Sequence, residues 1–346
     1  MPEKMQRVVL AARPKGQPDL TNFRLETGDI PQPGPGEVLV EVKYLSLDPY
    51  MRGRMDAAKS YAKPVAIGAT MEGEAVGEVI ASESPDFKPG DFAMGLFGWA
   101  SHGVLPAAQL RKIDPEVAPI QTSLGVLGMP GLTGWFGLQE HGRPKEGETL
   151  VVGAATGAVG SMVGQIGKAL GLRVVGVAGG AEKCAYASDV LGFDACLDHR
   201  AAPDADALNA QLAAQCPDGV DIYFDSVGAK TLEAVLPLMN PYGRIPVCGV
   251  IGWYSLAGAG PEAFADIMPL PRVWRTILVN KLSVNGFIIM DHYDRYPEFL
   301  AEVGPMVRDG RVIWREDVSD GLESAPQAFL SMLGGGNFGK QLVRVS

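Results

Sequence analysis

The stretch Val151-Val-Gly-Ala-Ala-Thr-Gly-Ala-Val-Gly160 decides the fold of this chain. It begins as an apolar strand, passes through small residues and enters a helical pattern. The apolar positions of that pattern are Val159, Met162, Val163, Ile166 and Leu170. The spacing of Ala154, Gly157 and Gly160 would let backbone N–H groups at the helix start approach a pyrophosphate. Close packing of helix on sheet without a ligand is the alternative, but this context favours dinucleotide binding.

Strand and helix patterns alternate through the middle of the chain. The expected strands are residues 150–153, 173–177, 195–197, 220–224, 243–249 and 282–287. Helical patterns lie between them, for example Leu232, Val235, Leu236 and Met239. Strands separated by helices in this way predict an α/β fold with a doubly wound parallel sheet. We place this domain at residues 126–303.

The end of the second of these strands bears on the choice of cofactor. An NAD site usually has an acidic residue there that accepts from the ribose 2′-OH. This strand instead ends in Val177-Ala-Gly-Gly180, and Lys183 follows. A lysine suits a 2′-phosphate, so the sequence favours NADP(H). In the alternatives Lys183 is a solvated helix residue, or Glu182 takes the role of the acid.

The N-terminal third is typical of a β domain. Val38, Val40 and Val42 alternate with other residues, and residues 73–82 and 91–97 are further expected strands between Gly/Pro turns. Short strands of this kind predict a small barrel-like domain at residues 1–125. A helix near 325–333 and a strand at 341–345 would return to it within residues 304–346. Five glycines spaced by three between 125 and 137 indicate either a closely packed helix or a loop.

Composition excludes several classes of protein. Forty acidic against 30 basic residues give a net charge of −10, which disfavours nucleic acid and membrane surfaces as partners. The four cysteines form no C-x-x-C pair, so we expect reduced, buried thiols and a cytoplasmic protein.

Catalytic side-chain clusters are also missing from the sequence. The four histidines are scattered, no zinc-ligand spacing occurs, and G-x-S-x-G is absent. We therefore expect no metal site and expect the cofactor to carry the reaction.

Motifs along nearly the whole chain resemble the zinc-independent medium-chain dehydrogenase/reductases, in the branch of prostaglandin, alkenal double-bond and curcumin reductases. They are Tyr44-Leu-Ser-Leu-Asp-Pro-Tyr-Met-Arg-Gly-Arg-Met55, Leu127-Gly-Met-Pro-Gly-Leu-Thr133, Ala155-Thr-Gly-Ala-Val-Gly160, Gly179-Gly-Ala-Glu-Lys183, Pro246-Val-Cys-Gly249 and Asn337-Phe-Gly-Lys340. The resemblance implies a GroES-like β-rich catalytic domain split around a Rossmann domain, NADPH as hydride donor and a homodimer. It also implies reduction of small α,β-unsaturated ketones or aldehydes.

The resemblance further implies site residues. Tyr254 would bind the substrate carbonyl, and Tyr50 would line the same pocket. The cofactor would contact Gly157, Ala158, Val159, Gly160, Lys183, His199, Ser226, Cys248, Gly249, Val250, Ile251, Tyr254, Phe287, Ile288, Ile289 and Asn337. Two positions depart from the family pattern: His199 stands where many relatives have tyrosine, and Ser226 lacks the amide of the usual asparagine.

Two other functions stay open. A quinone reductase shares the fold and cofactor but yields a hydroquinone in place of a saturated ketone. A non-catalytic NADPH-binding sensor would keep Gly157, Gly160 and Lys183 yet turn over no enone.

Overall fold

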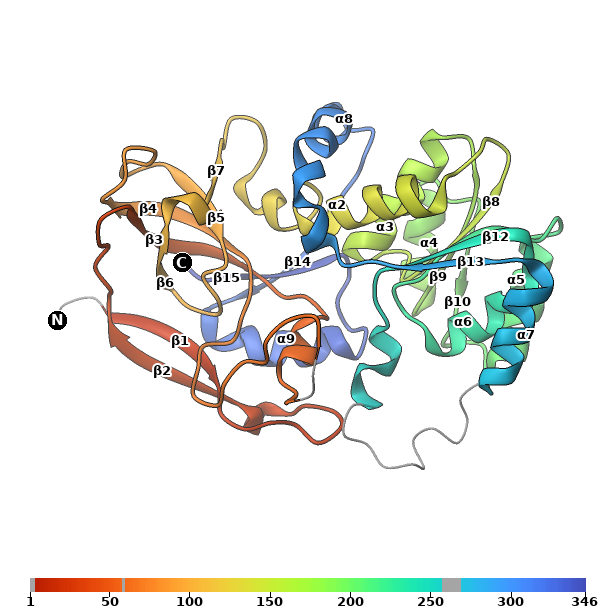
Figure 1. Ribbon diagram of the computed structural model, residues 1–346, viewed down its shortest axis with the longest axis horizontal. Coiled ribbons are helices and arrows are strands. Elements are labelled where there is room, and N and C mark those ends of the chain that lie inside the picture. Colours follow the sequence, from red (N-terminus) through yellow and green to blue (C-terminus); the bar gives the residue numbers. More distant parts are fainter. Residues whose placement is uncertain (1–3, 58–59, 257–268) are drawn as a thin grey trace. The chain divides into compact units, whose positions relative to one another are not determined.

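The computed structural model describes residues 4–57, 60–256 and 269–346. The chain divides into two compact units (Figure 1): residues 1–128 with 316–346, and residues 129–315. The return to the first unit begins at Glu316, not at residue 304 as expected. Helix α8 (Tyr296–Arg308) belongs to the second unit, where its Phe299 ring lies 5.9 Å from the Trp135 ring.

The second unit is built on a parallel sheet with the strand order β10-β9-β8-β11-β12-β13. Its strands are β8 (Thr149–Gly153), β9 (Arg173–Ala178), β10 (Ala195–Asp198), β11 (Val220–Phe224), β12 (Met239–Val247) and β13 (Ser283–Gly286). β8 is buried along its whole length, as a strand with both faces covered must be. The order reverses between β8 and β11, and open α/β sheets bind ligands at the carboxyl ends around such a switch point. The predicted doubly wound sheet is confirmed.

Helices cover both faces of this sheet (Figure 1). On one side lie α2 (Met129–Phe136), α3 (Ala158–Ala169) and α8; on the other lie α5 (Ala205–Gln215), α6 (Ala229–Val235) and α7 (Leu270–Asn280). Helix α4 (Ala181–Asp189) packs on β9 and β10. Helix α6 ends at Val235, and a 3-10 turn follows at Leu236–Leu238. The predicted helical position of Met239 is therefore wrong: Pro237 offers no N–H to extend the helix, and Met239 begins β12.

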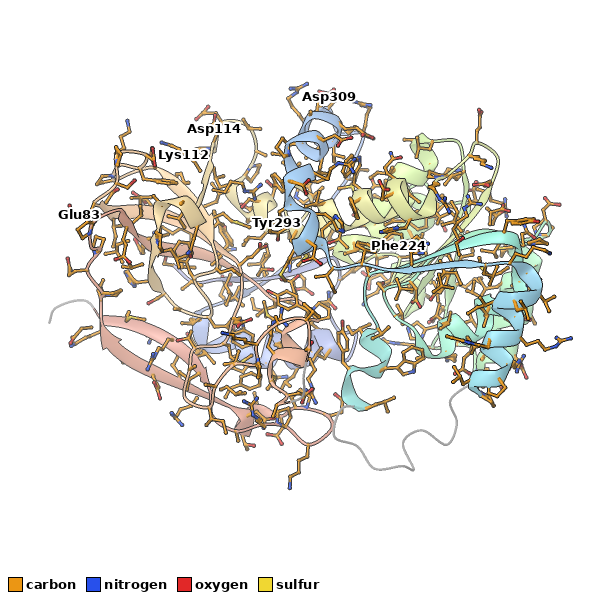
Figure 2. All side chains as sticks on the ribbon, in the orientation of Figure 1. Glu83, Lys112, Asp114, Phe224, Tyr293 and Asp309 are labelled. Carbon is orange, nitrogen blue, oxygen red and sulfur yellow. The ribbon has the colours of Figure 1, made fainter. Side chains whose placement is uncertain are left out.

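The regularly spaced glycines fall into two kinds of structure. Gly125 and Gly128 lie in the turn before α2, and the later ones are helical. A Cβ atom at Gly134 would lie 3.1 Å from Cγ2 of Val163, so glycine lets α2 approach α3 closely. A π-helical turn, Gly137–Gly142, continues α2, and Gly137 leaves room for the buried ring of Phe224. Phe224 is labelled in Figure 2. The helix alternative is thus correct from Met129 onward.

The first unit is rich in β structure. One small sheet pairs β1 (Lys4–Leu10) with β2 (Phe23–Asp29). A larger sheet contains β14 (Glu316–Asp320), β15 (Lys340–Arg344), β3 (Glu37–Ser46), β4 (Ala75–Ser82), β5 (Phe92–Gly95) and β7 (Arg111–Ile113), with β6 (His102–Pro106) beside β3. Strand β15 pairs antiparallel with β3, so the C-terminal segment joins the sheet that contains β3 to β7.

Two helices accompany these sheets, α1 (Met51–Arg54) and α9 (Ala325–Leu333). Phe329 of α9 contacts the buried Trp99 ring edge-on at 5.5 Å between centroids, which ties the C-terminal segment into the core. Within the described residues, no helix is both long enough and apolar enough to cross a membrane.

Close packing of α3 generates a stability prediction. A Cβ atom at the buried Gly164 would overlap the ring of Phe193, whereas Gly304 of α8 has open space at that position. We expect Gly164→Ala to lower the free energy of unfolding by about 1–3 kcal/mol through overpacking. Gly304→Ala should leave it unchanged or raise it by up to about 1 kcal/mol, because alanine favours helix. Equal unfolding free energies for the two variants in denaturant titrations would contradict this packing.

Candidate functional site

The turn between β8 and α3 folds its backbone so tightly that two of its positions have little or no room for a side chain. A Cβ atom at Gly160 would clash with the carbonyl oxygen of Ala154, and one at Gly157 would lie 3.2 Å from the same oxygen. Gly157 occupies the N-cap position of α3 and has no side chain to cap the first N–H groups. The first turn of α3 also contains no acidic residue. A bare helix start of this kind suits an anionic group such as a pyrophosphate.

The ends of β9 and β10 meet beside the start of α4. The carboxylate of Asp198 accepts hydrogen bonds from the backbone N–H of Gly180 at 2.8 Å and of Arg200 at 2.9 Å. A Cβ atom at Gly179 would lie 2.8 Å from Nε of Arg200 and 3.0 Å from Nε2 of His199. Glycine at this position therefore lets both side chains lie over the end of β9.

Three cationic side chains and one carboxylate act on His199 at this corner. Burial is the main cause that holds the pKa of His199 below its ordinary value, and the charges of Lys230, Arg200 and Lys183 act in the same direction, against Asp198. The Lys230 ammonium donates to the carbonyl oxygens of His199 at 2.6 Å and Ala202 at 2.8 Å. Glu182, the alternative ribose ligand, is exposed on the first turn of α4.

A buried carboxylate organises the end of β11. Asp225 is 1% exposed, and its Oδ1 accepts from the Tyr223 hydroxyl at 2.9 Å and from the N–H of Val227 and Gly228 at 2.9 and 2.7 Å. Burial raises the pKa of Asp225, against the effect of these three hydrogen bonds. The hydroxyl of Ser226 donates to the Gly153 carbonyl at 3.4 Å, at the switch point between β8 and β11.

The segment after β12 folds back onto this loop. Cys248 N–H donates to the Asp225 carbonyl at 3.0 Å, and Ile251 N–H to the Ser226 carbonyl at 3.3 Å. The Tyr254 hydroxyl lies 3.5 Å from the position of a Cβ atom on Gly249. Tyr254 is half-buried and thus reaches the carboxyl ends of β11 and β12 together with residues 248–251.

Residues 287–289 reach the same edge chiefly through their backbone. Phe287 N–H donates to the Val247 carbonyl at 3.2 Å. The side chains of Phe287 and Ile289 are buried, and the Phe287 ring lies 5.6 Å from the Phe136 ring. Ile288 is half-buried.

Two expected site residues belong to the first unit. Tyr50 precedes α1, and the guanidinium of Arg54 lies 5.3 Å from the centre of its ring. Asn337 is half-buried and donates from Nδ2 to the Gly339 carbonyl at 2.7 Å. The other expected residues lie in the second unit, along the carboxyl edge of its sheet.

Sequence reasoning missed two residues of this edge. Arg200 directly follows His199, and the strand-end argument that selected Lys183 could have found it. Asp225 stands inside the Phe224-Asp-Ser-Val-Gly228 string, but only its burial reveals its role.

The four cysteines differ in their burial. The four thiols are free; Cys184 and Cys216 are buried, but Cys196 and Cys248 are only half-buried, so the expectation of burial is wrong for these two. Among the described residues, no three His, Cys, Asp or Glu side chains gather to hold a metal ion.

Comparison with known proteins shows that the chain resembles oxidoreductases over nearly its whole length. Residues 6–113 match a family model described as the N-terminal domain of oxidoreductase, and residues 158–304 match one described as zinc-binding dehydrogenase. The chain is 49% identical to the NADPH-dependent curcumin reductase of Escherichia coli K12, over 99% of this chain and 98% of that protein. It is 41% identical to the NADP(+)-dependent 2-alkenal reductase of Nicotiana tabacum, over 90% and 88% of the two chains.

Solved structures extend the similarity to three dimensions. A structure of CurA from Vibrio vulnificus in complex with NADPH is 45% identical, covers 99% of both chains and superposes with a TM-score of 0.91. With identities of this size over its whole length, the chain belongs to the medium-chain dehydrogenase/reductase family, in the branch of the curcumin, 2-alkenal and prostaglandin reductases.

Proposed function

We propose that the protein uses NADPH to reduce the C=C bond of α,β-unsaturated ketones and aldehydes. The observation that carries this proposal is the position of the Tyr254 hydroxyl at the carboxyl ends of β11 and β12, beside Gly249. A phenolic donor at the ligand-binding edge of a dinucleotide fold suits a carbonyl oxygen that gains charge. The relatives named for NADPH-dependent curcumin and 2-alkenal reduction support the same function.

The residues present fit NADPH. The bare start of α3, where only glycine fits at position 160, would hold the pyrophosphate through residues 157–160. The end of β9 carries no acid for a ribose 2′-OH, and Lys183 and His199 lie beside it for a 2′-phosphate.

The nicotinamide half of NADPH would contact the segments that follow β11, β12 and β13. Ser226, residues 248–251 and residues 287–289 would flank it, with Phe287 and Ile289 contributing backbone because their side chains are buried. In the first unit, Asn337 is our candidate for a cofactor contact and Tyr50 for a substrate contact.

Bound NADPH supplies a hydride to the β-carbon of the substrate. Negative charge then develops on the carbonyl oxygen as the enolate forms, and the Tyr254 O–H stabilises it by donating a hydrogen bond. Water can supply the proton to the α-carbon, so this step needs no strong base. We propose that the reaction also needs no metal ion.

The proposal also covers the oligomeric state of the protein and its cellular compartment. We propose a homodimer, supported by the outer edge of β13, which pairs with no strand in the described part of the chain. The nearby α7 exposes Trp274 and Leu278, at 66% and 78%. A cytoplasmic location is supported by the free thiols.

The reaction can be tested with a panel of acceptors. We expect NADPH oxidation with 2-alkenals and with curcumin, each giving a product heavier by two hydrogens that keeps its carbonyl group in NMR spectra. A metal chelator should leave the rate unchanged. Turnover of a benzoquinone to its hydroquinone without turnover of enones would favour the quinone reductase. Tight NADPH binding without any turnover would favour the sensor.

Tyr254 should act in the chemical step more than in binding. Tyr254→Phe keeps the ring and removes the donor, so we expect single-turnover hydride transfer to slow about 10- to 1,000-fold. The dissociation constant of NADPH should change little. Tyr242→Phe, at an exposed position of the same unit, is the matched control and should transfer hydride at the wild-type rate. An unchanged rate in Tyr254→Phe would leave this tyrosine a wall residue only.

His199 should make NADPH binding pH-dependent. Burial and its cationic neighbours lower the pKa of His199 in the free protein, which favours the neutral imidazole. A bound 2′-phosphate would raise that pKa, so binding takes up a proton and tightens as pH falls through the window between the two values. We expect NADPH binding to tighten more in wild type than in His199→Tyr as the pH is lowered from 8 into the acidic range. Titration of the phosphate itself affects both proteins and cancels in the comparison. Parallel curves down to acidic pH would rule out the contact.

A further inference from the structure

A buried ion pair joins two segments of the first unit that lie far apart in the chain. The Lys340 ammonium lies 3.0 Å from Oδ1 of Asp48, and the two side chains are only 5% and 6% exposed. Asp48 follows β3, and Lys340 begins β15, which pairs with β3. Both residues belong to motifs that carry the family resemblance, yet the contacts proposed above use neither of them.

The charged groups of this pair are also bound to the backbone and to a hydroxyl. The Lys340 ammonium donates to the carbonyl oxygens of Leu47 at 2.7 Å and Gln341 at 3.2 Å. With Asp48, these are three acceptors for the three N–H donors of a lysine. The other carboxylate oxygen of Asp48 accepts from the Ser46 hydroxyl. The ammonium therefore holds the backbone that leads to Asp48 as well as the carboxylate itself.

Stability alone does not require a charged pair at this place. The desolvation of two buried charges can exceed the attraction between them, and apolar residues of similar volume often replace such pairs without loss of stability. An apolar pair could not bind the Leu47 carbonyl, however, whereas the ammonium fixes this part of the backbone. The position of the lysine is itself restricted, because its Cγ lies 3.4 Å from the position of a Cβ atom on Gly125.

The two joined segments carry the candidate site residues of this unit. Tyr50 lies two residues after Asp48, whose carbonyl accepts the first N–H of α1 at 3.1 Å. Asn337 lies three residues before Lys340 and donates to the Gly339 carbonyl at 2.7 Å. At most three residues along the chain thus separate the ion pair from either candidate contact.

We propose that the Asp48–Lys340 pair positions the site residues of this unit. It fixes Tyr50 for contact with the substrate and Asn337 for contact with NADPH, so the inference rests on the proposed function. A displacement of such a contact by about 1 Å can cost about 100-fold in rate. The competing role is stability alone, in which the pair only holds β3 and β15 together.

Paired substitutions separate these two roles. Lys340→Met leaves the Asp48 carboxylate buried without its cation, so it should unfold at a lower temperature than wild type. Asp48→Asn/Lys340→Met removes both charges and keeps an acceptor for Ser46, so it should unfold at a higher temperature than Lys340→Met. We nevertheless expect this double variant to lose about 10- to 100-fold in kcat/KM for a 2-alkenal. Its dissociation constant for NADPH should rise about 2- to 10-fold, the worth of one hydrogen bond.

The matched control removes an ion pair of the same residue types from the same unit. Lys112 of β7 lies 2.6 Å from Asp91, just before β5, and Asp91→Asn/Lys112→Met makes the same two substitutions there. This control should keep the wild-type kcat/KM and the wild-type dissociation constant for NADPH. A double variant of Asp48 and Lys340 that kept both values as well would overturn the inference and leave the pair a role in stability only.

A coupling measurement shows whether the pair acts through Asn337. Asn337→Ala should weaken NADPH binding less in the Asp48→Asn/Lys340→Met background than in wild type, because Asn337 is already displaced there. Equal weakening in the two backgrounds would overturn the positioning of Asn337. Asp48→Asn alone keeps an oxygen for the ammonium, so it serves for the same comparison, with smaller effects, should the double variant fail to fold.

The outcome is distinguishable from that of the proposed function. A wild-type protein that binds NADPH but reduces no enone would refute the reductase, and the NADPH measurements would still decide whether the pair acts through Asn337. A wild-type protein that reduces enones, together with a double variant that matches it in kcat/KM and NADPH binding, would refute this inference alone.

Discussion

The buried carboxylate of Asp225 is the interaction on which the ligand-binding edge depends. A carboxylate that is 1% exposed must find donors, because a buried charge without hydrogen bonds costs several kcal/mol. It finds them in the Tyr223 hydroxyl and in the N–H groups of Val227 and Gly228, which fixes the loop after β11. The carbonyl of that loop's Val227 then accepts from Gly252 N–H at 2.9 Å. The segment that bears Tyr254 is therefore positioned by a chain of contacts that begins at one buried acid.

Sequence patterns could predict the sheet because its central strands β8 and β9 are apolar and buried on both faces. The expected strand at residues 220–224 coincides with β11, and the others differ from the observed strands by a few residues at their ends. The glycines between 125 and 137 could not be interpreted as securely, because glycine carries no side chain whose periodicity would separate helix from loop. The close approach of Gly134 to Val163 of α3 is a tertiary contact that no local pattern contains.

The candidate site likewise has local features that the sequence could predict and tertiary features that it could not. The glycine turn after β8 and the missing acid after β9 are local features, and they indicated the cofactor class from the sequence alone. The position of Arg200 could not be predicted from the sequence, because its side chain crosses from the end of β10 to Gly179 at the end of β9 and so depends on the pairing of two strands. The lowered pKa of His199 could not be predicted from the sequence either, because burial is its main cause and Lys230 and Lys183, which add to it, lie far away along the chain.

The two ends of the candidate site differ in how freely evolution could alter them. Phe287 and Ile289 are packed into the interior, and Gly137 leaves just enough room for the Phe287 ring, so substitutions there would disturb the core. At the other end, Arg200 is exposed and Lys183 is half-buried. Substitutions of such surface residues usually change folding stability by less than about 0.5 kcal/mol. Substitutions at the ends of β9 and β10 should therefore leave the fold intact, whereas substitutions at Phe287 and Ile289 would disturb the core.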